Sequence, residues 1–244
     1  IDETLFPEKP GKLRTDAALV LQNGKILYER YGNGYGPEMK HLSWSMAKTI
    51  GGILAGIAID RGFLKLDDPV RKFIPDFKGT ATVKDIIQMS SGVDFQEEYF
   101  GIPVNADVVR MLYLEGPEMG FANYTVNRPL RAKEAEPGKH FFYSSGDANL
   151  LTEIVRLAMP KTAYDAFPWT ALFNPLGIPK AVFERDAKGN FVGSSYVYMT
   201  AREFAKIGEL IAGRGIYRGK RIIPEFYFKL MAEVAPGVNV AAAD

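Results

Sequence analysis

An apolar segment with a serine and a lysine at its head restricts the fold more than any other part of the sequence. It lies within HLSWSMAKTIGGILAGIAID (residues 41–60), where residues 50–59 carry no charge. Such a run is too short to span a membrane. Because it is apolar almost all round, it predicts a buried central helix from about Ser45 to Arg61, which Gly62 would end.

Three glycines interrupt this predicted helix, at positions 51, 52 and 56. Each glycine lowers helix propensity by about 1 kcal/mol relative to alanine. A sequence can tolerate that cost where a neighbouring chain must come close to the helix. We therefore expect close approach of neighbouring backbone at these positions.

Residues 17–31, AALVLQNGKILYERY, predict a β-hairpin. Two apolar runs flank Asn23-Gly24, a pair favoured in two-residue turns that need positive φ angles. The YGNGYG that follows lacks the G-x-G-x-x-G spacing, so it predicts a loop and not a phosphate site. A two-stranded hairpin is marginal by itself. We expect either a helical body that covers it or further strands beyond residue 244.

The remainder of the chain is predicted to be mainly helical. Thr82 has the position of an N-cap for a short helix through Met89, and the sequence from Thr200 to Glu203 forms a capping box. We expect an α/β (α+β) fold with an antiparallel sheet packed by helices. Residues 1–62 would form the hairpin and the apolar helix, and residues 63–244 a mainly helical region. Further helices are expected at about residues 105–114, 146–158, 163–172, 201–212 and 224–233.

Composition excludes several classes of function. Thirty basic and twenty-nine acidic side chains leave a net charge of +1, which gives no signal for nucleic acid or anionic lipid. The chain has no cysteine, which excludes disulfides, thiolate metal sites and a cysteine nucleophile. His41 and His140 are the only histidines, too few for a histidine-based metal site. We expect no metal, no cofactor, no nucleic-acid partner and no membrane span. Compartment and oligomeric state stay open.

Ser45 and Lys48 stand three residues apart, so they share one face of the predicted helix. Serine is a weak nucleophile that needs a neighbouring base, and an apolar setting disfavours the charged form of an amine. A neutral lysine could then accept the serine proton, and the helix N-terminus offers N–H groups to a developing negative charge. The alternative is that Ser45 is only an N-cap, with Lys48 reaching from the first turn to solvent.

A second stretch, PGKHFFYSSGDANLLTEIV, offers a partner for this pair. Tyr143 precedes a helix predicted to start near Asp147, and a phenol beside a cation could relay a proton. The alternative is that Tyr143 packs with neighbouring phenylalanines and that Ser145 caps the helix. Neither interpretation excludes the other.

Five ordered blocks of the sequence resemble one family. SMAK, TVKDIIQMSSGVDF, YSS, NPLGI and GSSYVYMTAREFAKIGELIAGRG together resemble the penicillin-recognising serine hydrolases. This group contains class C β-lactamases, DD-peptidases, family VIII esterases and 6-aminohexanoate-dimer hydrolases. The resemblance extends from about residue 16 to 232 and is strongest to the 6-aminohexanoate-dimer hydrolase branch. It implies a β-lactamase/DD-peptidase-like fold.

The resemblance also implies roles for individual residues. Ser45 would be the acylated nucleophile, Lys48 its activating partner and Tyr143 the general acid/base. Ser145 would take the third place of the Tyr-x-Asn element, and serine there departs from the β-lactamase pattern. Tyr99, in DFQEEYF, would contact the substrate; the alternative is that it is only a loop tyrosine.

The family's C-terminal element is not found in this sequence. Members of the family continue for roughly another hundred residues, which supply sheet strands, a K-T-G or H-x-G element and a second oxyanion-hole N–H. The only K-T-x after the first helix includes Thr162, which we interpret as an N-cap between two helices. We expect these C-terminal strands to be missing from this chain.

The sequence therefore predicts a serine hydrolase that cleaves a small ester or linear amide through an acyl-enzyme. The alternatives are β-lactamase or DD-peptidase activity, or a non-catalytic member that binds peptide or cell-wall ligands. A Ser-His-Asp mechanism is disfavoured because no G-x-S-x-G motif occurs. Pocket shape separates the substrates of this chemistry, and the sequence does not show it.

Overall fold

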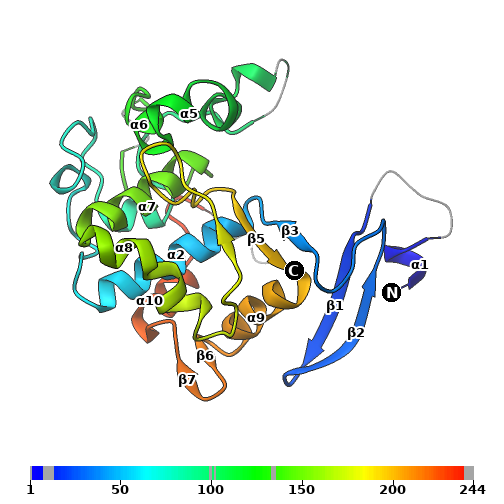
Figure 1. Cartoon of the computed structure of the whole chain (residues 1–244). Helices are drawn as coiled ribbons and strands as arrows, with labels where there is room; N and C mark the ends of the chain where they lie inside the picture. The colour runs from blue at the N-terminus through cyan, green and yellow to red at the C-terminus, as the bar shows by residue number, and fades with distance from the viewer. Residues whose placement is uncertain (1, 8–13, 99–100, 102, 133–135, 239–244) are drawn as a thin grey trace.

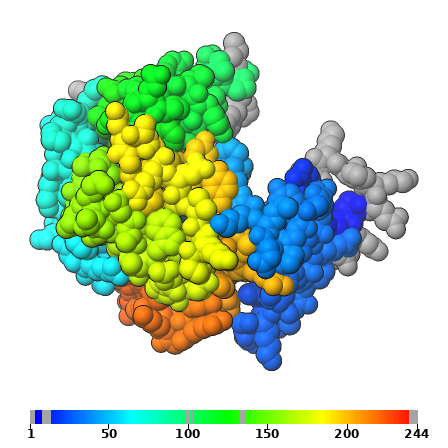
Figure 2. All heavy atoms as spheres, viewed as in Figure 1, coloured from blue at the N-terminus to red at the C-terminus, as the bar shows by residue number. Residues whose placement is uncertain are grey.

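A computed structural model describes residues 2–7, 14–98, 101, 103–132 and 136–238. A helical body forms most of the molecule, and a two-stranded hairpin lies at one side of it (Figure 1). The space-filling view shows this hairpin as a separate blue lobe beside the body (Figure 2). Among the described residues, no helix is long and apolar enough to cross a membrane.

The predicted hairpin is confirmed. Strands β1 (Ala17–Gln22) and β2 (Lys25–Tyr31) pair antiparallel. Asn23 and Gly24 both have positive φ, 52° and 74°, as a primed two-residue turn requires. Helix α9 (Ala201–Ala212) packs against β1, so a helix of the body covers the hairpin.

The apolar helix is also confirmed, as α2 (Met46–Asp60). Nine of its fifteen residues are buried, and Gly62 follows it with φ of 78°. We expected neighbouring backbone to approach Gly51, Gly52 and Gly56, but most of the close contacts at these glycines are with side chains. A Cβ at position 56 would lie 2.3 Å from the ring of Tyr227, and one at position 51 would lie 3.4 Å from Thr152. Backbone approach of the expected kind is found at Gly51, where an added Cβ would lie 3.7 Å from the Cα of Gly193.

A short three-stranded sheet links distant parts of the chain, and the sequence did not predict it. Strand β3 (Lys40–Leu42) pairs with β5 (Val197–Thr200), which also pairs with β4 (Val182–Phe183), all antiparallel. Strands of two to four residues are too short to show an alternating pattern. This sheet fixes the segment that leads into α2. Among the described strands, the hairpin does not join this sheet.

Two of the expected N-terminal caps are confirmed. Thr82 caps α3 (Val83–Ile87) and Thr200 caps α9, each in a full capping box. Helix α8 (Lys161–Pro168), in contrast, begins one residue before Thr162, so the interpretation of Thr162 as an N-cap is wrong. Helix α7 (Ser145–Ala158) is capped by Ser144, whose Oγ accepts the Asp147 N–H, and not by Ser145.

Several helical segments are shorter or less regular than expected. The helix expected at 105–114 is divided into a 3₁₀ turn, a short α-helix and a π-helical turn, and α8 continues into a second π-helical turn. The remaining elements are α1 (Asp2–Leu5), η1 (Val70–Lys72), η2 (Pro103–Asn105), α4 (Asp107–Val109), η3 (Arg110–Leu114), α5 (Gly116–Met119), α6 (Phe121–Val126), η5 (Trp169–Phe173), β6 (Ile216–Tyr217), β7 (Lys220–Arg221) and α10 (Glu225–Met231).

Candidate active site

Ser45 lies at the turn between β3 and α2. The turn is fixed by Ser43, whose N–H donates to the Val197 carbonyl and whose Oγ donates to the Ser195 carbonyl. Trp44 then takes a left-handed backbone, with φ of 44°, which is rare for a bulky residue and is typical of constrained functional segments. The turn leaves Ser45 exposed at the head of a buried helix.

The backbone N–H of Ser45 is the free donor at this helix end. The next three N–H groups donate to the carbonyls of residues 43, 44 and 45 at 3.0–3.2 Å. Among the described residues, the Ser45 N–H makes no hydrogen bond. The expected set of N–H groups at the helix N-terminus is therefore reduced to one, which belongs to Ser45 itself.

The Lys48 ammonium is surrounded by three oxygen atoms from three parts of the fold. Its Nζ lies 3.1 Å from Ser45 Oγ on α2, 3.0 Å from Ser145 Oγ on α7 and 3.1 Å from the carbonyl of Ser194 before β5. Asn149 of α7 holds the Ser194 segment through hydrogen bonds to its Oγ and N–H. Lys48 is half-buried. Its three N–H groups all have acceptors.

Tyr143 approaches Lys48 with the face of its ring. The ring centroid lies 4.8 Å from Nζ, within the range of a cation–π contact. The tyrosine is 42% exposed, and among the described residues its hydroxyl makes no hydrogen bond. The structure therefore brings Ser45, Lys48, Tyr143 and Ser145 together, with no partner for the Tyr143 hydroxyl among the described residues.

Glu97 is a site residue that the sequence analysis missed. Its Oε1 accepts a hydrogen bond from Ser145 Oγ at 2.6 Å, and its Oε2 accepts one from the Ser145 N–H at 2.9 Å. The partners lie 48 positions apart, so no local pattern connects them. The sequence feature that could have indicated Glu97 is the acidic loop DFQEEYF, in which only Tyr99 was predicted to be a site residue. Tyr99 lies outside the described residues.

Exposed apolar side chains flank Ser45. Trp44 and Met46, its two neighbours in the chain, are each about half exposed, and so is Tyr113. Tyr196 meets Trp44 edge-on at 6.3 Å between ring centroids. Burial, together with a hydrogen bond to Tyr113, raises the pKa of Tyr196, so its hydroxyl stays neutral. The surroundings of Ser45 can therefore contact an apolar part of a ligand.

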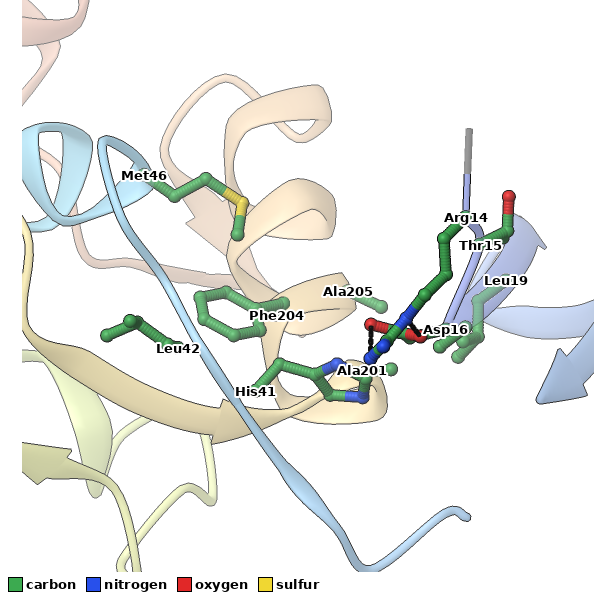
Figure 3. Close-up of a pocket in the computed structure, with 11 residues that line it drawn as sticks. Arg14, Thr15, Asp16, Leu19, His41, Leu42, Met46, Ala201, Phe204 and Ala205 are labelled. Atoms are coloured by element: carbon green, nitrogen blue, oxygen red, sulfur yellow. Dashed lines mark hydrogen bonds and ion pairs between the residues drawn. The ribbon is translucent and has the colours of Figure 1, made fainter. Parts of the chain in front are cut away.

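Two cavities adjoin the head of α2. One of about 290 Å³ has Lys48 in its wall, together with Met89, Phe141 and residues of α10. The larger one, of about 500 Å³, lies between the start of β1, β3 and the first turns of α9. Figure 3 shows Met46 and the Phe204 ring in this space, with His41 and the Arg14–Asp16 ion pair at the hairpin side. Lys48 lines the smaller cavity and not the larger one, and Ser45 lies in the wall of neither.

A buried carboxyl group lies beneath the site. Asp147, in the first turn of α7, is 1% exposed, and its Oδ1 accepts a hydrogen bond from Ser91 Oγ at 2.8 Å. Burial, with a smaller contribution from Glu97, raises the pKa of Asp147 to about 7. Hydrogen bonds from Ser91 and the charge of Arg131 oppose this shift.

This shift predicts a pH dependence of stability. The folded state binds the Asp147 proton more tightly than the unfolded chain, where the pKa is near its ordinary value of 3.8. Its contribution to the free energy of unfolding is therefore complete below pH 3.8 and is lost as pH rises through about 7. We expect the Asp147→Asn variant to lack this loss, which is on the order of 4 kcal/mol for the whole shift. Urea denaturation at several pH values from 4 to 8 measures it.

The exposed Asp76 supplies the matched control for this experiment. The Asp76→Asn variant should keep the pH dependence of the wild-type protein. An Asp147→Asn variant with the wild-type slope between pH 4 and 8 would show that Asp147 is not the titrating group.

Comparison with solved structures defines the class of fold. A Bacillus anthracis protein, provisionally named a 6-aminohexanoate-dimer hydrolase, superposes with a TM-score of 0.70 at 24% identity, covering 90% of this chain and 59% of that one. EstCE1, a hydrolase with promiscuous acyltransferase activity, gives 0.67 at 17% identity, covering 88% and 71%. The chain therefore has the β-lactamase/DD-peptidase fold predicted from its sequence.

The chain belongs to the beta-lactamase family, because the sequence profile of that family matches residues 4–241. It is similar to the 6-aminohexanoate-dimer hydrolase of Paenarthrobacter ureafaciens, with 25% identity over 237 residues. That match covers 91% of this chain and 59% of the relative. The predicted resemblance is thus confirmed, and the chain spans about three-fifths of the length of this relative.

Proposed function

We propose that this protein is a serine hydrolase that cleaves a small ester or linear amide through an acyl-enzyme on Ser45. One observation carries the proposal. Of the eight serines, all of which lie in the described ranges, Ser45 alone is exposed. The same hydroxyl lies 3.1 Å from the amine of Lys48. An accessible serine beside a half-buried amine is what nucleophilic catalysis requires.

The proposed reaction begins when neutral Lys48 takes the proton of the Ser45 hydroxyl. Ser45 Oγ then forms a bond to the substrate carbonyl carbon, and the carbonyl oxygen becomes an oxyanion near the free N–H of Ser45. The bond to the leaving group breaks as that group receives a proton from Lys48, directly or through the Tyr143 hydroxyl. A water molecule then gives a proton to Lys48 and bonds to the acyl carbon. The bond between that carbon and Ser45 Oγ breaks, the acid product leaves, and Oγ regains its proton from Lys48.

Two observations support an ester or linear amide with an apolar part. The exposed Trp44 and Met46, which precede and follow Ser45 in the chain, offer contact area for it. The Paenarthrobacter relative is named for hydrolysis of the 6-aminohexanoate dimer, and EstCE1 is named a hydrolase. Tyr99 stays a proposed substrate contact. β-Lactam or peptide hydrolysis, or binding without turnover, are the competing outcomes.

The test uses the full-length protein and three chromogenic substrates: p-nitrophenyl acetate, a linear aminohexanoate anilide and a cephalosporin. We expect turnover of the first two to exceed that of the third by about tenfold or more, since pocket contacts and not the reacting groups separate these substrates. Preferential turnover of the cephalosporin would favour a β-lactamase. Failure of all three, with no adduct after a fluorophosphonate probe, would leave a binding protein.

A further inference from the structure

The Glu97–Ser145–Lys48 chain of hydrogen bonds contains one group whose direction is not fixed by its own chemistry. A lysine ammonium only donates and a carboxylate only accepts, whereas a serine hydroxyl both donates and accepts at one oxygen. Ser145 Oγ lies between the two, 3.0 Å from Lys48 Nζ and 2.6 Å from Glu97 Oε1. Which way its single proton points depends on Glu97.

We infer that Glu97 is a positioning residue that fixes the Ser145 hydroxyl as an acceptor and so directs the lone pair of neutral Lys48 toward Ser45. This inference rests on the proposed function. The Glu97 carboxylate binds the only proton of the Ser145 hydroxyl. The oxygen of that hydroxyl can then face Lys48 only with a lone pair.

The consequence appears when Lys48 loses a proton. The ammonium donates to Ser45, Ser145 and Ser194, so all three of its N–H groups are used. The neutral amine has two N–H groups and one lone pair for the same three neighbours. The Ser194 carbonyl and the Ser145 oxygen both require a donor, and they take the two N–H groups. Ser45 is the neighbour left for the lone pair, and it is the one that must lose a proton.

The second oxygen of Glu97 holds the carboxylate in place. Glu97 Oε2 accepts the Ser145 N–H at 2.9 Å, at the first residue of α7. A helix N-terminus favours an anion, so the helix and the hydroxyl bind the same carboxylate. Glutamine cannot reproduce this arrangement, because its amide has one acceptor oxygen for two donors. If the glutamine oxygen accepted the Ser145 N–H, the glutamine NH₂ would donate to Ser145 Oγ. The Ser145 hydroxyl proton would then be free to point toward Lys48.

The experiment measures the rate at which a fluorophosphonate labels Ser45 in the full-length protein. In this reaction the Ser45 oxygen forms a bond to phosphorus, fluoride leaves and the serine proton passes to Lys48. We expect Glu97→Gln to slow labelling about tenfold or more, and to lower kcat on p-nitrophenyl acetate while KM changes little. The exposed neighbour Glu98 gives the control, and Glu98→Gln should label at the wild-type rate.

A double-mutant cycle separates positioning from a general structural effect. If Glu97 acts through the Ser145 hydroxyl, Glu97→Gln has no further effect in a Ser145→Ala background. Equal losses in both backgrounds, or wild-type labelling by Glu97→Gln, would overturn the inference. If the Glu97→Gln protein does not fold, the Ser145→Ala variant by itself tests the inference. Labelling of Ser45 at the wild-type rate in the Ser145→Ala variant would overturn it. No labelling of the wild-type protein would instead refute the proposed function.

Discussion

Replacing Ser45 with alanine is expected to lower kcat/KM for ester hydrolysis by about 10³-fold or more. The same change should abolish the covalent adduct with a fluorophosphonate, measured as the mass of the intact protein. The reason is that no other serine is exposed among the eight in the described ranges. The fold should survive, because the Ser45 side chain makes no cap bond to α2.

Ser90 gives a matched control for this experiment. Its hydroxyl is buried and has no hydrogen-bond partner among the described residues, so alanine there removes only an unsatisfied group. The Ser90→Ala variant should hydrolyse esters and form the adduct as the wild-type protein does. An adduct of unchanged mass and rate in Ser45→Ala would place the nucleophile elsewhere and end the proposal.

The Gly56→Ala substitution is expected to destabilise the protein by about 3 kcal/mol or more. Helix propensity alone would favour alanine by about 1 kcal/mol. Packing reverses the sign, because the new Cβ would lie 2.3 Å from two carbons of the Tyr227 ring. That ring is 1% exposed and belongs to α10, so relieving the clash requires the ring or α10 to repack. Urea denaturation measures the difference.

A glycine in α9 makes the comparison sharper. Gly208 is exposed, and a Cβ there would meet no atom within 4 Å. Gly208→Ala should therefore follow propensity and stabilise the protein by up to about 1 kcal/mol. Combining Gly56→Ala with Tyr227→Ala should cost less than the sum of the two single changes, because the clash is removed. A Gly56→Ala protein as stable as the wild type would show that α10 can move away from α2.

Sequence reasoning succeeded where a local pattern determines the structure. The Asn23-Gly24 turn, the apolar α2 and the Thr200 capping box each involve neighbours within a few residues. It failed where distant residues decide. Strand β3 exists because Lys40–Leu42 meets residues about 160 positions away, and three residues carry no periodicity. The π-helical turn at Arg110–Leu114 likewise has no pattern that distinguishes it from an α-helix.

The same division applies to the candidate site. Ser45 and Lys48 are one turn apart and were visible from their spacing. Tyr143 was proposed from its place before the second helix, and the role of Ser145 followed from the resemblance. Glu97 and the Ser194 carbonyl were not visible, because only the folded chain brings them to Ser145 and Lys48. The structure also indicates a consequence of having serine, Ser145, at the third place of the Tyr-x-Asn element. An asparagine has separate donor and acceptor atoms, whereas this hydroxyl requires Glu97 to fix its direction.

The three contacts of Lys48 determine when the site forms during folding. Its acceptors lie 3, 97 and 146 residues away along the chain. The first forms with a single turn of helix, but the others must wait until long loops have closed. A compact intermediate with all its helices would still lack the oriented amine. Reactivity of Ser45 is therefore expected to report native tertiary structure, because it requires both long-range contacts of Lys48.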